Sequence, residues 1–168
     1  MNDPAANESA PVRSVTLKSG VSRITLHGVP HQPGIATKIF GEIGTRGINV
    51  DDIIQTASDQ GRNVIISFTV DTEWTEQARV ASREIAERFG HTNLEITEQL
   101  ARLRIVGMGM RAHSGVAAKV FDALSAVKAN IENISTSEIV ISILVPEANG
   151  ELALNALYDA FGLERDED

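Results

Sequence analysis

Along this chain, stretches in which apolar and polar residues alternate are followed by stretches with apolar residues at helical spacing. Residues 22–28 alternate with a period of two, which is typical of a half-buried strand. Ile35, Ile39 and Ile43 then recur at helical spacing, which predicts an amphipathic helix over residues 34–46. The elements predicted next are strands over 48–56 and 63–70, a helix capped by Asp71 or Thr72 and ended by Gly90, and a strand over 93–100. The order β-α-β-β-α-β predicts a ferredoxin-like α+β fold, with both helices on one face of an antiparallel sheet.

A second set of elements repeats this order but lacks its last strand. The predicted elements are a strand over 102–108, a helix over 115–128, strands over 131–137 and 138–145, and a helix over 148–161. The residues after Gly162 are too few and too polar to form the missing strand. A spare strand pattern lies over residues 12–18, with Val12, Val15 and Leu17 as candidate buried positions. We therefore predict that this N-terminal strand completes the second sheet, so that the first domain is inserted in the second.

An ungapped repeat relates the two sets. Gly34 and Gly115 lie 81 residues apart (115 − 34), and many neighbours match at the same offset. The identical pairs include Arg23 and Arg104, Ile24 and Ile105, Gly28 and Gly109, Ala36 and Ala117, Lys38 and Lys119, Phe40 and Phe121, Asn49 and Asn130, and Ile53 and Ile134. This offset exceeds the ~20 to 50 residues of a solenoid repeat and suits a small domain. The predicted domains cover residues 22–100 and 101–163, between a disordered tail over 1–11 and an acidic tail over 164–168.

Composition narrows the classes of function. A net charge of −8 argues against non-specific binding to nucleic acid or to an anionic membrane, both of which require basic patches. The sequence contains no cysteine, which excludes disulfides, thiolate metal sites and a cysteine nucleophile. It has neither a signal-peptide pattern nor the apolar run of ~20 residues that spans a membrane. We therefore expect a cytoplasmic protein with no nucleic-acid or membrane partner.

Candidate binding chemistry lies where the first helix of each domain begins. The free N–H groups and the positive dipole end of a helix N-terminus favour an anion such as a carboxylate. Gly34 and Gly115 permit a close approach of the backbone at these two positions. Asp51 or Glu132, on the strand expected to face the loop, would suit the ammonium group of the same ligand. A zwitterion is therefore one interpretation, and an ordinary helix start without any ligand is the other.

Other polar residues do not combine into a catalytic site. The four histidines, at positions 27, 31, 91 and 113, share no metal-ligand spacing. No nucleophile elbow, phosphate-binding loop or zinc signature occurs, so we expect neither catalytic residues nor a metal or cofactor. Recognition of RNA on an open sheet would need exposed aromatic and basic residues, which this acidic chain with 4% aromatics does not offer.

Two stretches resemble the regulatory region of aspartokinases. The more specific stretch is NIENISTSEIVISILV over 130–145, and the other is VPHQPGIATKIFGEIGTRGINVDDIIQ over 29–55. The resemblance covers residues 12–163 and implies two ACT domains, which are small ferredoxin-like domains that bind amino acids at domain interfaces. In this family the first ACT domain is likewise inserted in the second, and the catalytic domain is a separate part that the matched stretches do not include.

The resemblance implies an effector site on the first domain and a second possible site on the other. The implied effector-binding residues are Gln32, Gly34, Ile35, Ala36, Asn49, Val50, Asp51 and Gln55, with Asn133, Ile134, Ser135 and Thr136 from a neighbouring domain. The second possible site comprises His113, Ser114, Gly115, Val116, Ala117, Asn130, Ile131 and Glu132. Three residues depart from the family pattern: Gln32 replaces a frequent Asp, Ser114 replaces Pro, and Val140 replaces Arg or Lys. The identity of the effector therefore cannot be copied from a relative.

The function implied is that of a non-catalytic regulatory subunit or domain of aspartate kinase. Lysine, threonine or both would bind at ACT–ACT interfaces and inhibit the pathway to lysine, threonine and methionine by feedback. The partners implied are a second copy of the chain, paired through the ACT domains, and a catalytic aspartokinase subunit. The alternative is a stand-alone ACT-type assembly scaffold, or an amino-acid sensor without a kinase partner.

Overall fold

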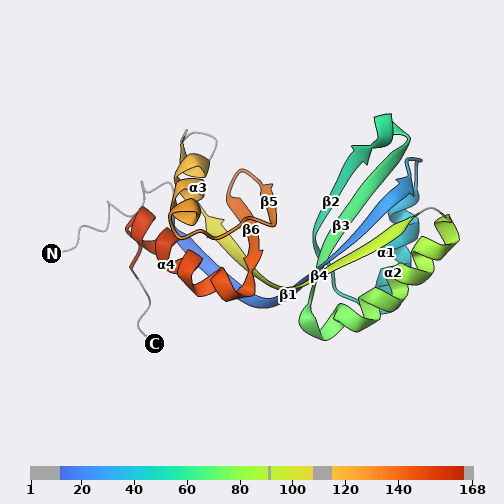
Figure 1. The fold of residues 1–168 in the computed structure, drawn as a ribbon, viewed down its shortest axis with the longest axis horizontal. Coiled ribbons are helices and arrows are strands. Elements are labelled where there is room, and N and C mark those ends of the chain that lie inside the picture. Colours follow the sequence, from blue (N-terminus) through green and yellow to red (C-terminus); the bar gives the residue numbers. More distant parts are fainter. Residues whose placement is uncertain (1–11, 91, 108–114, 165–168) are drawn as a thin grey trace. The chain divides into compact units, whose positions relative to one another are not determined.

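The structure is a computed structural model that describes residues 12–90, 92–107 and 115–164 (Figure 1). The strands are β1 (Ser14–Pro30), β2 (Asp51–Ser58), β3 (Asn63–Asp71), β4 (Asn93–Val106), β5 (Asn133–Thr136) and β6 (Val140–Pro146). The helices are α1 (Ile35–Thr45), α2 (Thr75–Phe89), α3 (Val116–Ala126) and α4 (Gly150–Phe161), with short 3-10 turns η2 (Asp59–Gly61), η3 (Thr72–Trp74) and η4 (Glu147–Asn149). The predicted tail over 1–11 lies outside the described residues.

The chain divides into two compact units. The inner unit is Gly20–Glu98, and the outer unit comprises the residues before Gly20 and after Glu98. Neighbouring strands follow the order β2-β3-β1-β4 in the inner unit and β1-β4-β6-β5 in the outer unit. β3 pairs with β1 and β2, and β6 pairs with β4 and β5, each time in antiparallel orientation. The α+β class with antiparallel sheets, predicted from the periodicity, is confirmed.

β1 and β4 each run through both units without a turn. The patterns over 12–18 and 22–28 were predicted as two strands, and so were those over 93–100 and 102–108. Each pair forms one long strand instead, because the chain continues in extended form on both sides of the unit boundary. The backbone turns left-handed for a single residue there, at Gly20 (φ 71°) in β1 and at Gln99 (φ 57°) in β4.

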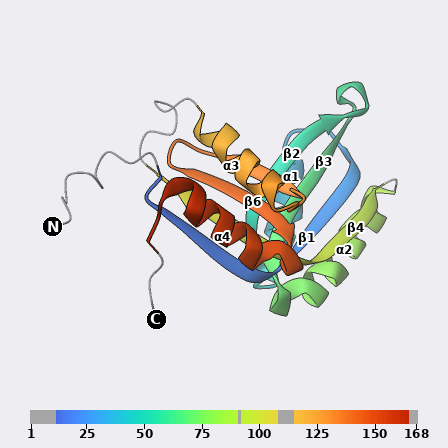
Figure 2. The same ribbon diagram turned by 60° about the vertical axis from the view of Figure 1, so that its left-hand side comes forward.

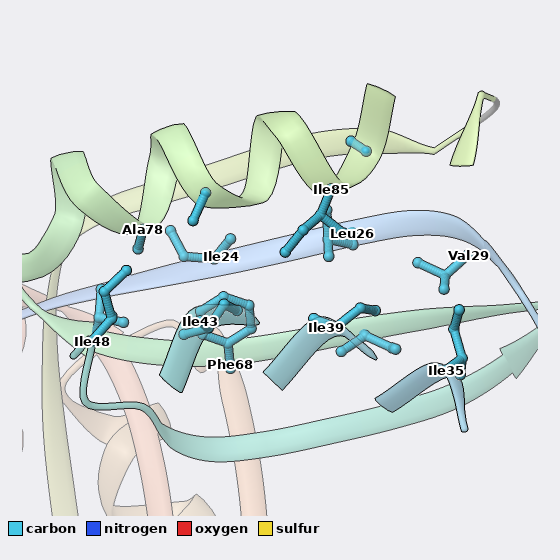
Figure 3. Packing of buried hydrophobic residues seen from close by; sticks show 14 of the residues in the cluster. Ile24, Leu26, Val29, Ile35, Ile39, Ile43, Ile48, Phe68, Ala78 and Ile85 are labelled. Atoms are coloured by element: carbon cyan, nitrogen blue, oxygen red, sulfur yellow. The ribbon is translucent and has the colours of Figure 1, made fainter. Parts of the chain in front are cut away.

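The core of the inner unit lies between its sheet and the helices α1 and α2. Ile39 and Ile43 of α1 pack beside Phe68 of β3 and Ile24 of β1, all of them fully buried (Figure 3). Phe40 meets the Phe68 ring edge-on, with ring centroids 5.5 Å apart. The helical spacing of Ile39 and Ile43 predicted that they belong to the buried face of this helix, and that prediction is confirmed.

The core of the outer unit includes the N-terminal residues of the described chain. Val12 and Val15 are buried in one cluster with Leu103 of β4 and Leu124 of α3. The Arg13 amide donates to the Val106 carbonyl at 2.7 Å, and the Tyr158 hydroxyl donates to the Val15 carbonyl at 3.2 Å. The helices α3 and α4 of this unit lie next to one another (Figure 2). Residues 12–19 therefore fill part of the outer core, although the sequence separates them from β4 by 74 positions or more (93 − 19).

Candidate functional site

The α1 helix of the inner unit begins at a glycine in a left-handed conformation. Gly34 has φ 81° and ψ 0°, no side chain caps this helix end, and the first turn carries no acidic residue. The Lys38 amide donates to the Gly34 carbonyl at 3.1 Å, and the Ile35 amide donates to the Gln32 carbonyl at 3.2 Å. A Cβ atom added to Gly34 would have no neighbour within 4 Å, so the glycine is required by its φ angle rather than by crowding.

His31 attaches this loop to the turn between β2 and β3. Its amide donates to the Arg62 carbonyl at 3.1 Å, and its ring Nδ1 lies 2.9 Å from the Gly61 carbonyl oxygen. Both partners lie at the turn between β2 and β3, and Gly61 is 30 positions from His31 in the chain, so the sequence alone does not reveal the contact. The loop is thus held at one end of the sheet while Gln32, Gly34 and Ala36 are exposed.

The register of the strands shows which part of β2 lies at the same end of the sheet as the Gly34 loop. Pro30 pairs with Asn63, and Asn63 pairs with Ser58, so the loop after Pro30 lies at the Ser58 end of β2. Gln55 is three positions from Ser58, or about 10 Å along a strand. It pairs with Ile66, whose side chain is in the core, so Gln55 lies on the helix-covered face at the exposed edge. Among the predicted β2 residues, Gln55 is therefore the one at the end nearest the Gly34 loop.

The structure places Asn49, Val50 and Asp51 at the other end of α1. The Ile48 amide donates to the Ile43 carbonyl in the last turn of the helix, and Asp51 pairs with Thr69 at the far end of β3. Figure 3 shows the same separation, with Ile35 at one end of the helix and Ile43 and Ile48 at the other. Seven strand positions separate Asp51 from Ser58, which is about 23 Å. These three residues and the Gly34 loop are therefore not brought together within the inner unit.

A bulge interrupts β2 at Asp52. The pairing with β3 shifts between Asp51 and Ile54, and Asp52 has a positive φ of 42°. The Asp52 amide donates to the Asp51 side chain at 2.9 Å. Ile53, next to the bulge, is 51% exposed on the edge strand. The edge of the inner sheet is thus irregular and apolar at this position.

The outer unit begins its helix α3 in the same way. Gly115 has φ 99° and ψ −9°, has no side-chain cap, and accepts from the Lys119 amide at 2.9 Å. Val116 is buried and Ala117 is exposed, as their counterparts Ile35 and Ala36 are. The predicted residues His113 and Ser114 lie outside the described residues.

The remaining predicted residues lie on or just before the edge strand β5. Ile134 and Thr136 pair with the core residues Ile143 and Ile141, so they lie on the helix-covered face. The predicted residues that complete this segment are Asn130, Ile131 and Glu132 before the strand and Asn133 and Ser135 within it, the last two on the opposite sheet face. Thr136 occupies the position equivalent to Gln55, and Ile134 (40% exposed) the position equivalent to Ile53.

These two helix starts offer hydrogen-bond donors rather than reactive groups. An uncapped N-terminus next to a left-handed glycine can accept a carboxylate on its backbone amides. No group of three or more histidine or acidic side chains in the described part of the chain is arranged to hold a metal ion. Within the same residues, no helix is long and apolar enough to cross a membrane.

Comparison with known protein families matches both units to one class. Residues 22–79 match the ACT domain family, and residues 103–161 match a second family that is also described as ACT domain. The fold and these matches define a protein with two ACT domains.

Individual relatives narrow the class further. The regulatory subunit of aspartate kinase from Thermus flavus is 36% identical, with a TM-score of 0.82, and the match covers 90% of this chain and 99% of that one. A structure of aspartokinase alpha and beta subunits matches with the same identity and coverage and a TM-score of 0.80. Aspartate kinase of Pseudomonas fluorescens is 34% identical over 98% of this chain, which spans only 40% of that relative. The chain belongs to the aspartokinase family and corresponds to its regulatory part.

One more distant structure contains a ligand. Aspartokinase III of E. coli, in complex with lysine and aspartate, matches 90% of this chain and 33% of its own, with 25% identity and a TM-score of 0.70. The predictions of two ACT domains and of membership in the regulatory part of aspartokinase are confirmed by these comparisons. The roles of individual site residues stay predictions.

Proposed function

We propose that this chain binds an amino acid of the aspartate family, lysine or threonine. Binding of this effector inhibits a catalytic aspartokinase subunit by feedback. The observation that carries the proposal is the uncapped, left-handed glycine start of α1, which leaves backbone amides for a ligand carboxylate. Support for the ligand class comes from the lysine complex of E. coli aspartokinase III, and support for the partner comes from the aspartokinase alpha and beta subunits.

The Gly34 loop is the better of the two sites on the described geometry. Gln32 and Ala36 are exposed beside it, and the exposed Gln55 lies on the helix-covered face at the same end of the sheet. A ligand whose carboxylate lies on the α1 amides would reach the Gln55 amide before it could reach Asp51. We therefore propose Gln55 as the side chain that selects the ligand, and Asp51 as the competing assignment.

Calorimetric titration of the chain with L-lysine, L-threonine and L-methionine tests the proposal. Binding of lysine or threonine should also raise the melting temperature, because a ligand that binds only the native state stabilises it. The proposal would be contradicted if millimolar concentrations of all three amino acids gave no heat of binding and no change in the melting temperature. That result would favour the alternative of an assembly scaffold. In that case Gln32, at a position where the family frequently has Asp, would have removed the contact with the ligand.

Variants at equivalent positions of the two units test which of the two helix starts binds the amino acid. Gly34→Ala and Gly115→Ala each place an alanine at positive φ, and each should destabilise the fold by about 1 to 2 kcal/mol. Only Gly34→Ala should weaken amino-acid binding, by about tenfold or more, because its methyl group lies where the carboxylate approaches. Gln55→Ala should weaken binding by about threefold to tenfold, and Asp51→Asn should leave it unchanged. If Asp51→Asn weakened binding and Gln55→Ala left it unchanged, the ligand would be reassigned to the other end of β2.

We further propose that two copies pair through the edge strands. Ile53 on β2 and Ile134 on β5 are exposed apolar side chains at equivalent edge positions, and an exposed edge with apolar residues favours pairing with another strand. Sedimentation analysis of Ile53→Glu should show a shift from dimer to monomer. Val80→Glu, at an exposed apolar position of α2 away from the sheet edge, is the matched control.

A further inference from the structure

The inner unit carries a hollow between its two helices, on the flank of α1 away from β2. Its volume is about 330 Å³, and it is lined by Lys38, Glu42, Ile85, Arg88 and Phe89. Lys38 and Glu42 are one turn apart on α1, and the other three residues come from the last turn and a half of α2. Ala36, which belongs to the Gly34 site, is two positions from Lys38 and therefore about 200° away around the helix. The hollow therefore lies on the other side of α1 from Ala36.

Its lining combines an apolar floor with cationic side chains. Phe89 is half-buried and offers apolar surface to an occupant, and the buried Ile85 lies beside it in the lining. Arg88 donates a hydrogen bond to Glu42, and Glu42 also accepts from Arg46 at 2.8 Å, so the carboxylate is already engaged by two guanidinium groups. The Lys38 side chain is exposed and has no ion-pair partner among the described residues. Two cations and one anion line the hollow, which leaves one net positive charge in a chain of net charge −8.

The outer unit has different side chains and a different contact at the equivalent place. Lys119, the counterpart of Lys38, lies over the Phe161 ring at 5.1 Å from its centroid. Phe161 ends α4 as Phe89 ends α2, and the residues equivalent to Glu42 and Arg88 are Ala123 and Ala160. A cation over an aromatic face is a favourable contact, so the lysine in the outer unit already has a partner. In the inner unit the lysine and the ring line a hollow instead.

We propose that this hollow binds a small amphipathic carboxylate, with the carboxylate on Lys38 and the apolar part against Phe89 and Ile85. A volume of about 330 Å³ is at the lower end of the range for ligand pockets, which suits a ligand with few heavy atoms. Arg88 presents its guanidinium at the rim, held there by Glu42, and adds a second positive charge to the site. The proposal does not depend on the effector site at Gly34.

Titration of the full chain with benzoate, followed by amide chemical shifts in NMR, tests this site. Benzoate should shift the signals of residues around Lys38, Ile85 and Phe89, while the neutral isostere benzamide should bind at least about tenfold more weakly, since the charge-assisted contact to Lys38 is lost. Lys38→Met keeps the apolar stem and removes the charge, and it should weaken benzoate binding by about tenfold. Lys119→Met, the matched change in the outer unit, should leave benzoate binding unchanged.

Three outcomes would overturn the proposal. They are the absence of benzoate shifts at these residues up to tens of millimolar, equal binding of benzamide and benzoate, and equal weakening by Lys38→Met and Lys119→Met. Because lysine and threonine are titrated separately, failure here leaves the test of the Gly34 site unaffected.

Discussion

At the scale of single residues, glycines serve two different physical purposes in this chain. Gly34 and Gly115 are required by a positive φ and have open space around them. Gly150, at the start of α4, has an ordinary helical conformation but no space: an added Cβ would lie 3.1 Å from the Ala101 Cβ and 3.2 Å from the Leu17 Cδ1. Sequence patterns can indicate the first kind, since a glycine precedes an amphipathic helix, but only packing reveals the second.

Gly150→Val should destabilise the protein by about 1 to 3 kcal/mol, because the larger side chain overpacks the contact with Ala101 and Leu17. The matched control is Gly41→Ala, at an exposed position in the middle of α1 with no atom near the added Cβ. This control should stabilise the protein by about 0.5 to 1 kcal/mol, since alanine favours the helix over glycine. Urea denaturation measures both changes. A Gly150→Val variant as stable as the parent chain would show that α4 does not pack as closely on these residues as described.

At the scale of elements, an ion-pair network joins the helices α1 and α2. Glu42 of α1 accepts from Arg88 of α2 and from Arg46, the residue that follows α1, and Arg46 also pairs with Glu84. The hydrogen bond from Arg88 lowers the pKa of the Glu42 carboxyl below its ordinary 4.5, although partial burial opposes this. A carboxyl with a lowered folded-state pKa stabilises the fold above its unfolded pKa. That stabilisation is lost as the pH falls through the folded value.

We therefore expect Glu42→Gln to reduce stability at pH 7 by up to about 1 kcal/mol, the size of a partly exposed ion pair. The difference between parent and variant should shrink as the pH falls below 4.5, the ordinary pKa of the carboxyl. It should disappear below the lowered folded-state pKa, because the parent carboxyl is then neutral like the glutamine side chain. Urea denaturation at several pH values between 7 and 3 measures this convergence. Glu87→Gln, an exposed α2 position without an ion pair among the described residues, is the control. A stability difference for Glu42→Gln that stays constant with pH would contradict the assignment.

At the scale of the whole molecule, the two units are nested in sequence. All residues of the inner core lie within Gly20–Glu98, whereas the outer core needs Val12 and Val15 from the start of the chain. The sequence predicts this arrangement, because the second set of elements lacks a strand and a spare strand pattern lies over residues 12–18.

Fragments of the chain test the nesting directly. A fragment over residues 20–98 should fold alone and unfold cooperatively on heating, because it contains a complete core. A fragment over 99–168 should fail to do so, since burial of Val12 and Val15 is lost. Joining residues 12–19 to 99–168 by a short Gly/Ser linker should restore folding, because β1 and β4 are neighbours in the sheet. Circular dichroism during heating measures all three. Cooperative unfolding of 99–168 alone would contradict the role assigned to the N-terminal strand.

By itself, the sequence determined the order of strands and helices, the repeat, and the resemblance to the regulatory part of aspartokinase, because periodicity and local glycine signals depend on neighbouring residues. It also predicted the Gly34 and Gly115 helix starts. Only the tertiary structure decided that Gln55 lies at the end of β2 nearest the Gly34 loop while Asp51 lies at the other, since strand register depends on pairing across the sheet. The same holds for the hollow at Lys38, because two helices distant in sequence create it.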